Sequence, residues 1–439
     1  MSGDLTALQE LRKELASGAR TPRSVAEEAL SHANSNKGRN VYISLDAERT
    51  LREADALPKL FPSAPKPLLY GLPVSIKDCF EVAGFRTTMG SSFYANLNGM
   101  AAEDSAVAAR LRAQGAMIIG KTNLHELAYG ITGENRAYGN CLQPNDEHSF
   151  TGGSSSGAAA SVQEGSAVAA IGTDTGGSIR VPTALCGEAG YRASIELAHE
   201  RGLWRGGIHL APSFDTLGWL FRDVRDAPLL AEALFGIQAP AQAEMKVRVG
   251  CVGPEFLDDC EPDVLDGFEE WKQEMREQGG EIVAIETKFW NEAMAIFAPV
   301  QAHEAAGFHG PKTGNDFSHF ESSIAERLTW GASIPEVEVK RRREQLAVFR
   351  TKLDTLLQQC DFAILPCAPM GRLVAGADHS RTRVRILRYT APMSLAGVPV
   401  VTLPARAGAG VQLAAARGKD ARLLAYAAQL AENGRHLEK

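Results

Sequence analysis

One glycine- and serine-rich stretch, residues 151–180, constrains the fold of this chain more than any other. It reads TGGSSSGAAASVQEGSAVAAIGTDTGGSIR and holds two short serine-bearing glycine turns, Gly152–Gly157 and Thr175–Arg180. The run between them, 158–171, is too apolar for a flexible linker, which would be polar throughout. We expect this segment to be buried, with its glycines bringing backbone close to another group.

Two serine turns at the ends of one packed segment can converge in space, and buried hydroxyl groups need hydrogen-bond partners. The pattern therefore indicates a catalytic serine site. Tight packing of small residues around a turn between strand and helix, with no chemistry, is the alternative interpretation.

The composition is that of a globular protein with a large core, since 44% of the 439 residues are hydrophobic. A net charge of −7 offers no basic surface, which argues against a nucleic-acid partner. The segment MSGDLTALQELRKELASG lacks the basic-then-apolar pattern of a signal peptide, and no apolar run is long enough to cross a bilayer. We expect a cytoplasmic protein without a membrane partner.

Metal sites and disulfides are not expected either. The seven cysteines are an odd number and form no CxxC pair, which argues against a disulfide framework and a zinc site. His125-Glu126 lacks the second histidine of an HExxH zinc motif.

Apolar periodicity and capping residues predict alternating helices and strands along the chain. Helices are predicted over 5–15, 21–32, 46–57, 104–114, 224–235, 262–278, 322–328, 335–358 and 420–432. Strands are predicted over 74–76, 116–119, 247–252, 281–285, 363–366 and 398–403. This alternation predicts an α/β fold in which helices cover both sides of a central mixed β-sheet.

A serine nucleophile needs a base within hydrogen-bond reach, and the usual base is histidine. This chain has no G-x-S-x-G motif, and we interpret the flanking His148 and His199 as surface or loop residues. A lysine whose pKa is lowered by burial is the alternative base. Lys77 is the best candidate because it ends an apolar strand; an ordinary lysine in solvent is the competing interpretation.

The second turn offers a further catalytic part. Successive backbone N–H groups of Thr175, Gly176, Gly177 and Ser178 can form a nest for a negative oxygen. Such an oxyanion hole fits acyl transfer.

Several passages resemble the amidase signature family of serine hydrolases. The strongest are GLPVSIKD at 71–78, GAMIIGKTNLHELAYG at 115–130, TGGSSSGAAASV at 151–162 and GTDTGGSIRVPTALCG at 172–187. APSFDTLGW at 211–219 and LAGVPVVTLP at 395–404 are weaker. The resemblance implies a single domain with the amidase-signature fold over 1–439. Within it we expect a helical region at about 1–65, a catalytic core at about 66–235, a peripheral layer at about 245–390 and a return to the core at about 391–439.

The same resemblance implies a Ser–cis-Ser–Lys triad. By motif match Ser178 is the nucleophile, Lys77 is the base and Ser154 relays the proton, with a cis peptide between Gly153 and Ser154. The reaction would pass through an acyl-enzyme on Ser178, which water then attacks. No metal or organic cofactor is implied.

Neighbouring residues are expected to support this triad. Asp174 and Arg180 match family positions, and we expect them to brace the second turn by hydrogen bonds. Ser155 and Ser156 are expected to support the first turn, and Cys186 to be a packed small residue.

One further motif matches the pattern of a phosphate-binding loop. Residues 115–122, GAMIIGKT, satisfy the phosphate-loop pattern GxxxxGK[ST]. Because the intervening residues Ala116–Ile119 read as a strand rather than an exposed loop, we interpret this match as coincidental. The amidase signature family, which the chain resembles, also has this segment and does not bind nucleotides through it.

The chain departs from the family pattern in two places. Gly190–Gly207 lacks the usual proline and the Gly-Arg-Val-Ser element, although Arg192 keeps one basic position. The passage 405–420, ARAGAGVQLAAARGKD, is shorter than the family passage that carries a hairpin. The first difference leaves the substrate preference open.

The resemblance as a whole implies an amidase that hydrolyses a small carboxamide to carboxylate and ammonia. SFDTLGW and RYTAPMSLAGVP are similar to small amidases of the indole-3-acetamide hydrolase type. A small-molecule amide is the implied partner, with a homodimer as one option for assembly. The alternatives are the amidase subunit of a tRNA-dependent amidotransferase and a non-catalytic family scaffold; the scaffold predicts loss of Lys77, Ser154 or Ser178, and all three are present.

Overall fold

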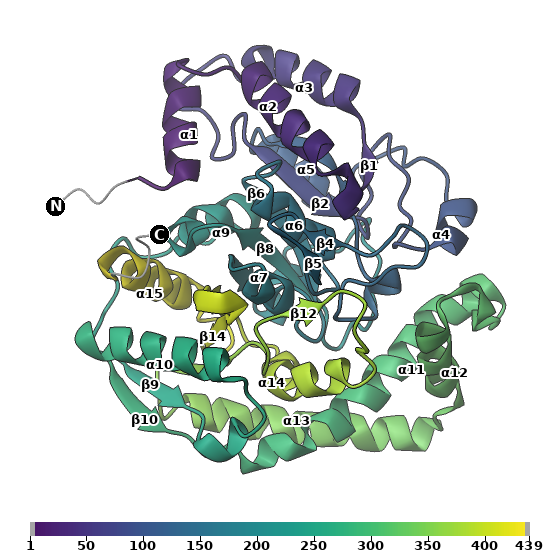
Figure 1. Ribbon diagram of the computed structural model, residues 1–439, viewed down its shortest axis with the longest axis vertical. Helices are drawn as coiled ribbons and strands as arrows, with labels where there is room; N and C mark the ends of the chain where they lie inside the picture. Colours follow the sequence, from purple (N-terminus) through teal and green to yellow (C-terminus); the bar gives the residue numbers. More distant parts are fainter. Residues whose placement is uncertain (1–4, 435–439) are drawn as a thin grey trace.

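An 11-stranded mixed sheet runs through the computed structural model, which describes residues 5–434. Its strand order is β1-β3-β2-β6-β8-β7-β13-β14-β11-β9-β10, and a separate three-stranded sheet has the order β12-β5-β4. The large sheet extends from β1 near the top of Figure 1 to β10 at the bottom, with helices packed around it. The predicted α/β fold with a central mixed sheet is confirmed.

The strands are β1 (Tyr42–Leu45), β2 (Pro73–Lys77), β3 (Met117–Thr122), β4 (Leu142–Gln143), β5 (Asp146–Phe150), β6 (Ala169–Asp174), β7 (Ala189–Arg192), β8 (Thr216–Phe221), β9 (Arg248–Cys251), β10 (Glu281–Ala284), β11 (Phe362–Pro366), β12 (Leu373–Val374), β13 (Val400–Leu403) and β14 (Val411–Ala414). The α-helices are α1 (Ala7–Ser17), α2 (Pro22–Ser35), α3 (Ala47–Leu60), α4 (Ser92–Leu97), α5 (Ala106–Ala113), α6 (Ser156–Gln163), α7 (Arg180–Leu185), α8 (Ile195–Glu200), α9 (Ala227–Phe235), α10 (Pro262–Glu277), α11 (Ala293–Thr313), α12 (Ser322–Ser333), α13 (Glu336–Leu357), α14 (Thr382–Ala396) and α15 (Asp420–Asn433). Short 3₁₀ helices lie at Lys37–Arg39, Glu126–Ala128, Val224–Asp226, Pro254–Phe256, Lys288–Glu292, Phe317–His319 and Arg406–Gly408.

Three neighbouring parallel strands, β3, β2 and β6, determine where the chemistry of the chain can gather. Lys77 at the end of β2 lies opposite Thr122 of β3, and Ile76 lies opposite Ile171 of β6. Because parallel strands end at the same edge of a sheet, Lys77 and the last residues of β6 share that edge. The second serine turn follows β6 directly. The first serine turn precedes α6, the helix that leads into β6, so both turns can lie at that edge of the sheet.

Local signals predicted many element ends well. Thr21 caps α2 with Pro22 in its first turn, and Gly18 ends α1 in a left-handed conformation, as the cap rules predict. The phosphate-loop match falls largely on β3, every residue of which is buried, so it is a core strand rather than an exposed nest.

The helices α11 and α14 were not predicted. Both contain internal prolines, and α14 is buried over most of its circumference, so neither shows the one-sided apolar periodicity of a surface helix. The short passage 405–420 still contributes the strand β14 to the sheet. β13 and β14 form an antiparallel pair, with Val401 opposite Leu413.

The segment between the serine turns is a packed core element, as predicted. Residues 156–162 of α6 are buried, and the Ser161 hydroxyl lies 2.8 Å from that of Ser75 on β2. No helix within residues 5–434 combines the length and hydropathy that spanning a bilayer requires.

Candidate active site

The two serine turns meet beside the end of β2. The Ser155 N–H donates to the Ser178 carbonyl oxygen at 3.2 Å, which ties the first turn to the second. The peptide between Gly153 and Ser154 is cis, as the family resemblance implied. Sequence-distant hydroxyl groups are therefore gathered at one edge of the sheet.

Lys77 is fully buried at this edge and contacts three hydroxyl groups. Its Nζ lies 2.8 Å from Ser154 Oγ, 3.1 Å from Ser155 Oγ and 2.7 Å from Thr173 Oγ1. It makes no ion pair with a carboxylate among residues 5–434. Burial lowers the pKa of Lys77 to about 8, because removing an ammonium group from water disfavours its charged form.

A neutral amine has one lone pair, which can accept a hydrogen bond from one of these hydroxyls. The Ser155 hydroxyl donates to the Thr173 carbonyl oxygen at 3.2 Å, which occupies its only proton. The Ser154 and Thr173 hydroxyls have no other acceptor within residues 5–434, so either can donate to Lys77 Nζ, and donation by Ser154 is what a proton relay requires. Thr173 was not singled out from the sequence.

Ser178 lies on the wall of a narrow pocket with a cavity volume of about 10 Å³, which is room for about one water molecule. Other lining residues are Tyr129, Gly130, Thr175, Gly176, Gln301 and Arg383. The Ser178 and Ser154 side chains share no hydrogen bond in the described part of the chain, so the relay contact is not formed here.

The turn before Ser178 needs glycine at one position. Gly177 has a φ of +120°, and a Cβ there would lie 2.9 Å from Thr390 Cγ2. Its N–H donates to Asp174 Oδ1 at 2.9 Å and is not available to an oxyanion. Of the four N–H groups predicted to form the nest, three are therefore available. The N–H groups of Thr175, Gly176 and Ser178 make no hydrogen bond within residues 5–434.

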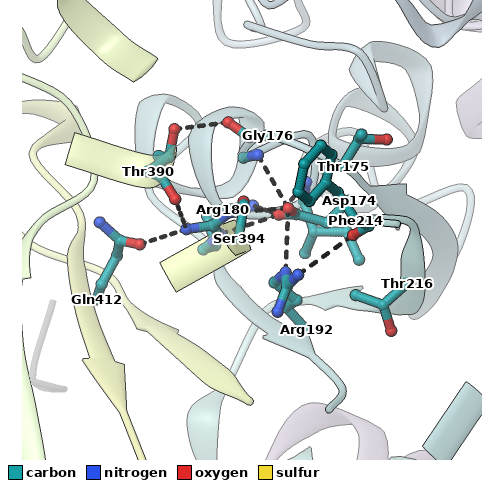
Figure 2. Close-up of polar contacts among 12 residues, drawn as sticks. Asp174, Thr175, Gly176, Arg180, Arg192, Phe214, Thr216, Thr390, Ser394 and Gln412 are labelled. Carbon is teal, nitrogen blue, oxygen red and sulfur yellow. Dashed lines mark hydrogen bonds and ion pairs between the residues drawn. The ribbon is translucent and has the colours of Figure 1, made fainter. Parts of the chain in front are cut away.

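A buried ionic network holds this turn in place (Figure 2). Arg180 Nη2 and Arg192 Nε contact Asp174 Oδ1 at 2.8 and 3.2 Å, and all three side chains are fully buried. Burial alone would raise the pKa of Asp174, but Arg180 and then Arg192 hold it well below its usual value. Arg180 also donates to Gln412 Oε1 at 2.7 Å and Ser394 Oγ at 2.7 Å, which anchors the turn to the C-terminal part of the sheet and to α14.

The hydrogen bonds expected of Asp174 and Arg180 are present, whereas Arg192 was recognised only as a basic position. Asp215 was missed as well. Its Oδ1 accepts a hydrogen bond from Thr175 Oγ1 at 2.6 Å, and its Oδ2 accepts from the Leu210 and Ala211 N–H groups. The only available signal was its place inside the weakly matching passage APSFDTLGW.

The histidines near these motifs do not contact either serine side chain. His148 is on the surface with 77% of its side chain exposed, and His199 is exposed and stacks on Trp204. His125 donates its backbone N–H to the Ser154 carbonyl oxygen at 3.2 Å, while its ring is buried. Burial, then the charges of Arg327 and Arg383, lower the pKa of His125 to about 3, so the ring is neutral at ordinary pH.

No group of three or more histidine, cysteine or acidic side chains suited to a metal ion occurs within residues 5–434. The lysine of the phosphate-loop match, Lys121, is fully buried and lies 2.5 Å from Asp78 Oδ1. It forms part of the core rather than a phosphate site.

Known proteins share both this sequence pattern and this architecture. A family model described as Amidase matches residues 24–424. The chain is 31% identical to a glutamyl-tRNA(Gln) amidotransferase subunit of Gloeobacter violaceus, over 91% of this chain and 90% of that protein. It is 30% identical to 2-amino-5-chloromuconic acid deaminase of Comamonas testosteroni, over 91% of this chain and 89% of that protein. A crystal structure of an amidase superposes with a TM-score of 0.88 at 30% identity, covering 97% of this chain and 99% of that one.

Proposed function

The chain belongs to the amidase family, and from that premise we propose that it hydrolyses a small carboxamide to a carboxylate and ammonia. Ser178 is the proposed nucleophile, Lys77 the base and Ser154 the proton relay. One observation supports this assignment above the others: Lys77 is fully buried, lies 2.8 Å from Ser154 Oγ, and has only hydroxyl groups as side-chain partners among residues 5–434. A lysine with a pKa of about 8 can be neutral at working pH and can accept a proton.

In the proposed first half-reaction, Ser178 Oγ attacks the amide carbon. Its proton passes to Ser154, and the Ser154 proton passes to Lys77 Nζ. The negative oxygen of the tetrahedral intermediate accepts hydrogen bonds from the free N–H groups of Thr175, Gly176 and Ser178. The C–N bond then breaks, ammonia leaves with the proton returned through Ser154, and an acyl ester remains on Ser178.

In the second half-reaction, water attacks the ester carbonyl and gives its proton to Lys77 through the same relay. The bond between Ser178 Oγ and the acyl carbon breaks, the carboxylic product leaves, and Ser178 regains its proton. Asp174 and Arg180 contribute by holding the turn so that the N–H groups stay aligned. No step needs a metal or an organic cofactor.

The narrowness of this pocket favours a compact amide. The passages SFDTLGW and RYTAPMSLAGVP, which are similar to small amidases of the indole-3-acetamide hydrolase type, favour a small monoamide. The divergent 190–207 segment allows a different preference.

Transfer of ammonia within a larger complex is a second candidate function. The relative from Gloeobacter violaceus, 31% identical, belongs to a tRNA-dependent amidotransferase. If this chain has such a role, it needs partner chains and should release little ammonia alone. The two proposals are therefore separated by the activity of the isolated chain.

The test is ammonia release from a panel of short aliphatic, aryl, indolyl, dicarboxylic half-amide and peptide amides. The matched control is Ser178→Ala, which removes one buried oxygen and should leave the unfolding midpoint nearly unchanged. Release by the wild-type chain and not by the variant supports the amidase. Equal release by both, or none from any amide by the folded wild-type chain, contradicts it.

A further inference from the structure

Two arginines beside the pocket have no anionic partner. Arg383 of α14 lines the pocket with Ser178, and Arg327 of α12 lies next to it against Tyr129. Neither makes an ion pair among residues 5–434, and both are half-buried. The Nε atom of Arg327 is buried and has no hydrogen-bond partner.

Each guanidinium is nevertheless held in a defined position. Arg383 Nη2 donates to Gln301 Oε1 at 2.8 Å, and Arg327 Nη2 donates to the Tyr129 carbonyl oxygen at 2.7 Å. Both groups also lie over the Tyr129 ring, at 4.8 Å for Arg327 and 5.7 Å for Arg383. Two like charges are thus fixed on one aromatic residue that itself lines the pocket.

This arrangement differs from that of several interior arginines, although the partly buried Arg350 also has only carbonyl partners, Ser213 and Leu395, within residues 5–434. Arg180 and Arg192 share Asp174, and the partly buried Arg112 contacts both Glu53 and Asp104. The chain has an excess of acidic residues, with a net charge of −7. A shortage of carboxylates therefore does not explain why two arginines beside the pocket have none.

The pocket lining itself supplies no negative charge, although Glu321 and Glu326 lie near enough to Arg327 to oppose the lowering of its pKa by burial. None of the described residues that line the pocket is Asp or Glu. Burial, then the charge of Arg327, lowers the pKa of Arg383 to about 10, so the group is cationic at neutral pH. Burying a charge without a counterion is costly, and an anionic ligand removes that cost when it binds.

We propose that the amide substrate carries a carboxylate, which Arg383 binds directly while Arg327 supplies a second positive charge behind Tyr129. The planar guanidinium fork matches a carboxylate better than it matches a neutral group. Because Arg383 and Ser178 line the same narrow pocket, the amide and the carboxylate belong to one short molecule, such as a half-amide of a dicarboxylic acid. The amide group of this ligand rests on the proposed function, whereas its carboxylate rests on the two arginines alone.

The binding test uses the Ser178→Ala protein, so that it does not depend on turnover. Malonamate, succinamate and glutaramate are titrated by calorimetry, each beside the neutral amide of equal length with a methyl ketone in place of the carboxylate. We expect at least one half-amide to bind about thirtyfold more tightly than its neutral counterpart, the value of a charged hydrogen-bonded pair.

Variants then test whether Arg383 causes the preference for the half-amide. Arg383→Gln should reduce it to about threefold or less, and Arg383→Lys should retain part of it, because the charge remains but the fork is lost. The matched control is Arg385→Gln, two residues along α14, where an exposed arginine pairs with Asp259 at 3.3 Å. That control should leave the preference unchanged, and unfolding midpoints verify that all variants are folded.

Two results overturn the inference: no half-amide binds better than its neutral counterpart, or Arg383→Gln keeps the full preference. Ammonia release by wild-type protein separates this inference from the amidase proposal. Selective binding without ammonia release contradicts the amidase and leaves the carboxylate site standing. Ammonia release from neutral amides only, without selective binding of half-amides, contradicts the carboxylate site and supports the amidase.

Discussion

Two fully buried lysines on neighbouring parallel strands have opposite surroundings. Lys121 on β3 lies 2.5 Å from Asp78 Oδ1 and donates to Thr87 Oγ1 at 2.6 Å. Lys77 on β2 has three hydroxyl partners and, in the part of the chain that the structure describes, no carboxylate partner. A carboxylate stabilises the ammonium form, whereas hydroxyls can either accept from an ammonium group or donate to an amine. The partner, rather than burial, therefore separates a structural lysine from a lysine able to exchange a proton.

Replacing Lys77 should have the largest effect on activity. Lys77→Met should lower kcat/KM for amide hydrolysis by roughly 10⁴-fold, because both the nucleophile and the relay lose their base. The unfolding midpoint should change little, since Met fills a similar volume. Ammonia release measures the loss, and a variant within tenfold of wild type would remove Lys77 from the mechanism.

Replacing Lys121 should instead affect stability. Lys121→Met leaves Asp78 buried without its counterion, which should lower the free energy of unfolding by about 3–5 kcal/mol. Urea denaturation measures this change. Combining it with Asp78→Asn should recover part of the stability, and a loss below about 1 kcal/mol in the single variant would contradict the structural role.

The pH dependence of the wild-type chain tests the protonation state of Lys77. The pKa of this group is lowered to about 8, and the neutral amine is the proposed base. kcat/KM should therefore be highest above pH 8 and fall as pH decreases, by about a hundredfold between pH 9 and pH 6. A flat profile over this range would count against a lysine base.

Giving Lys77 the environment of Lys121 should move that profile. Thr173→Asp places a carboxylate where the Thr173 hydroxyl now lies, 2.7 Å from Lys77 Nζ. An adjacent negative charge should raise the Lys77 pKa and shift the midpoint of the pH profile upward by about one to two units. The neutral control is Thr173→Asn, and an equal shift in both variants would mean that charge is not the cause.

Much of the site could be predicted because its signals are local. The serine turns, the strand that ends in Lys77 and the caps of α1 and α2 are each encoded within a few residues. Asp174 and Arg180 lie six positions apart in one motif, and the sequence indicated that each would brace the turn, which they do through contact with one another. Short-range geometry is what sequence patterns describe best.

The unpredicted parts depend on contacts between distant segments. Arg192 reaches Asp174 only because β7 and β6 both pair with β8. Arg383 and Arg327 belong to α14 and α12, outside the recognised motifs. The occupied N–H of Gly177 depends on side-chain geometry at the turn, which no residue pattern specifies.

Covalent labelling of Ser178 tests the proposed roles of the serine and the lysine without any knowledge of the substrate. Wild-type and Lys77→Met proteins are treated with methanesulfonyl fluoride, a small serine reagent, and the rate and position of labelling are measured by mass spectrometry from pH 6 to 10. We expect one adduct on Ser178, with a rate that rises with pH to a midpoint near 8 and is largely lost in Lys77→Met. An adduct on another residue, or equal labelling of Ser178 in both proteins, would contradict a serine nucleophile activated by Lys77.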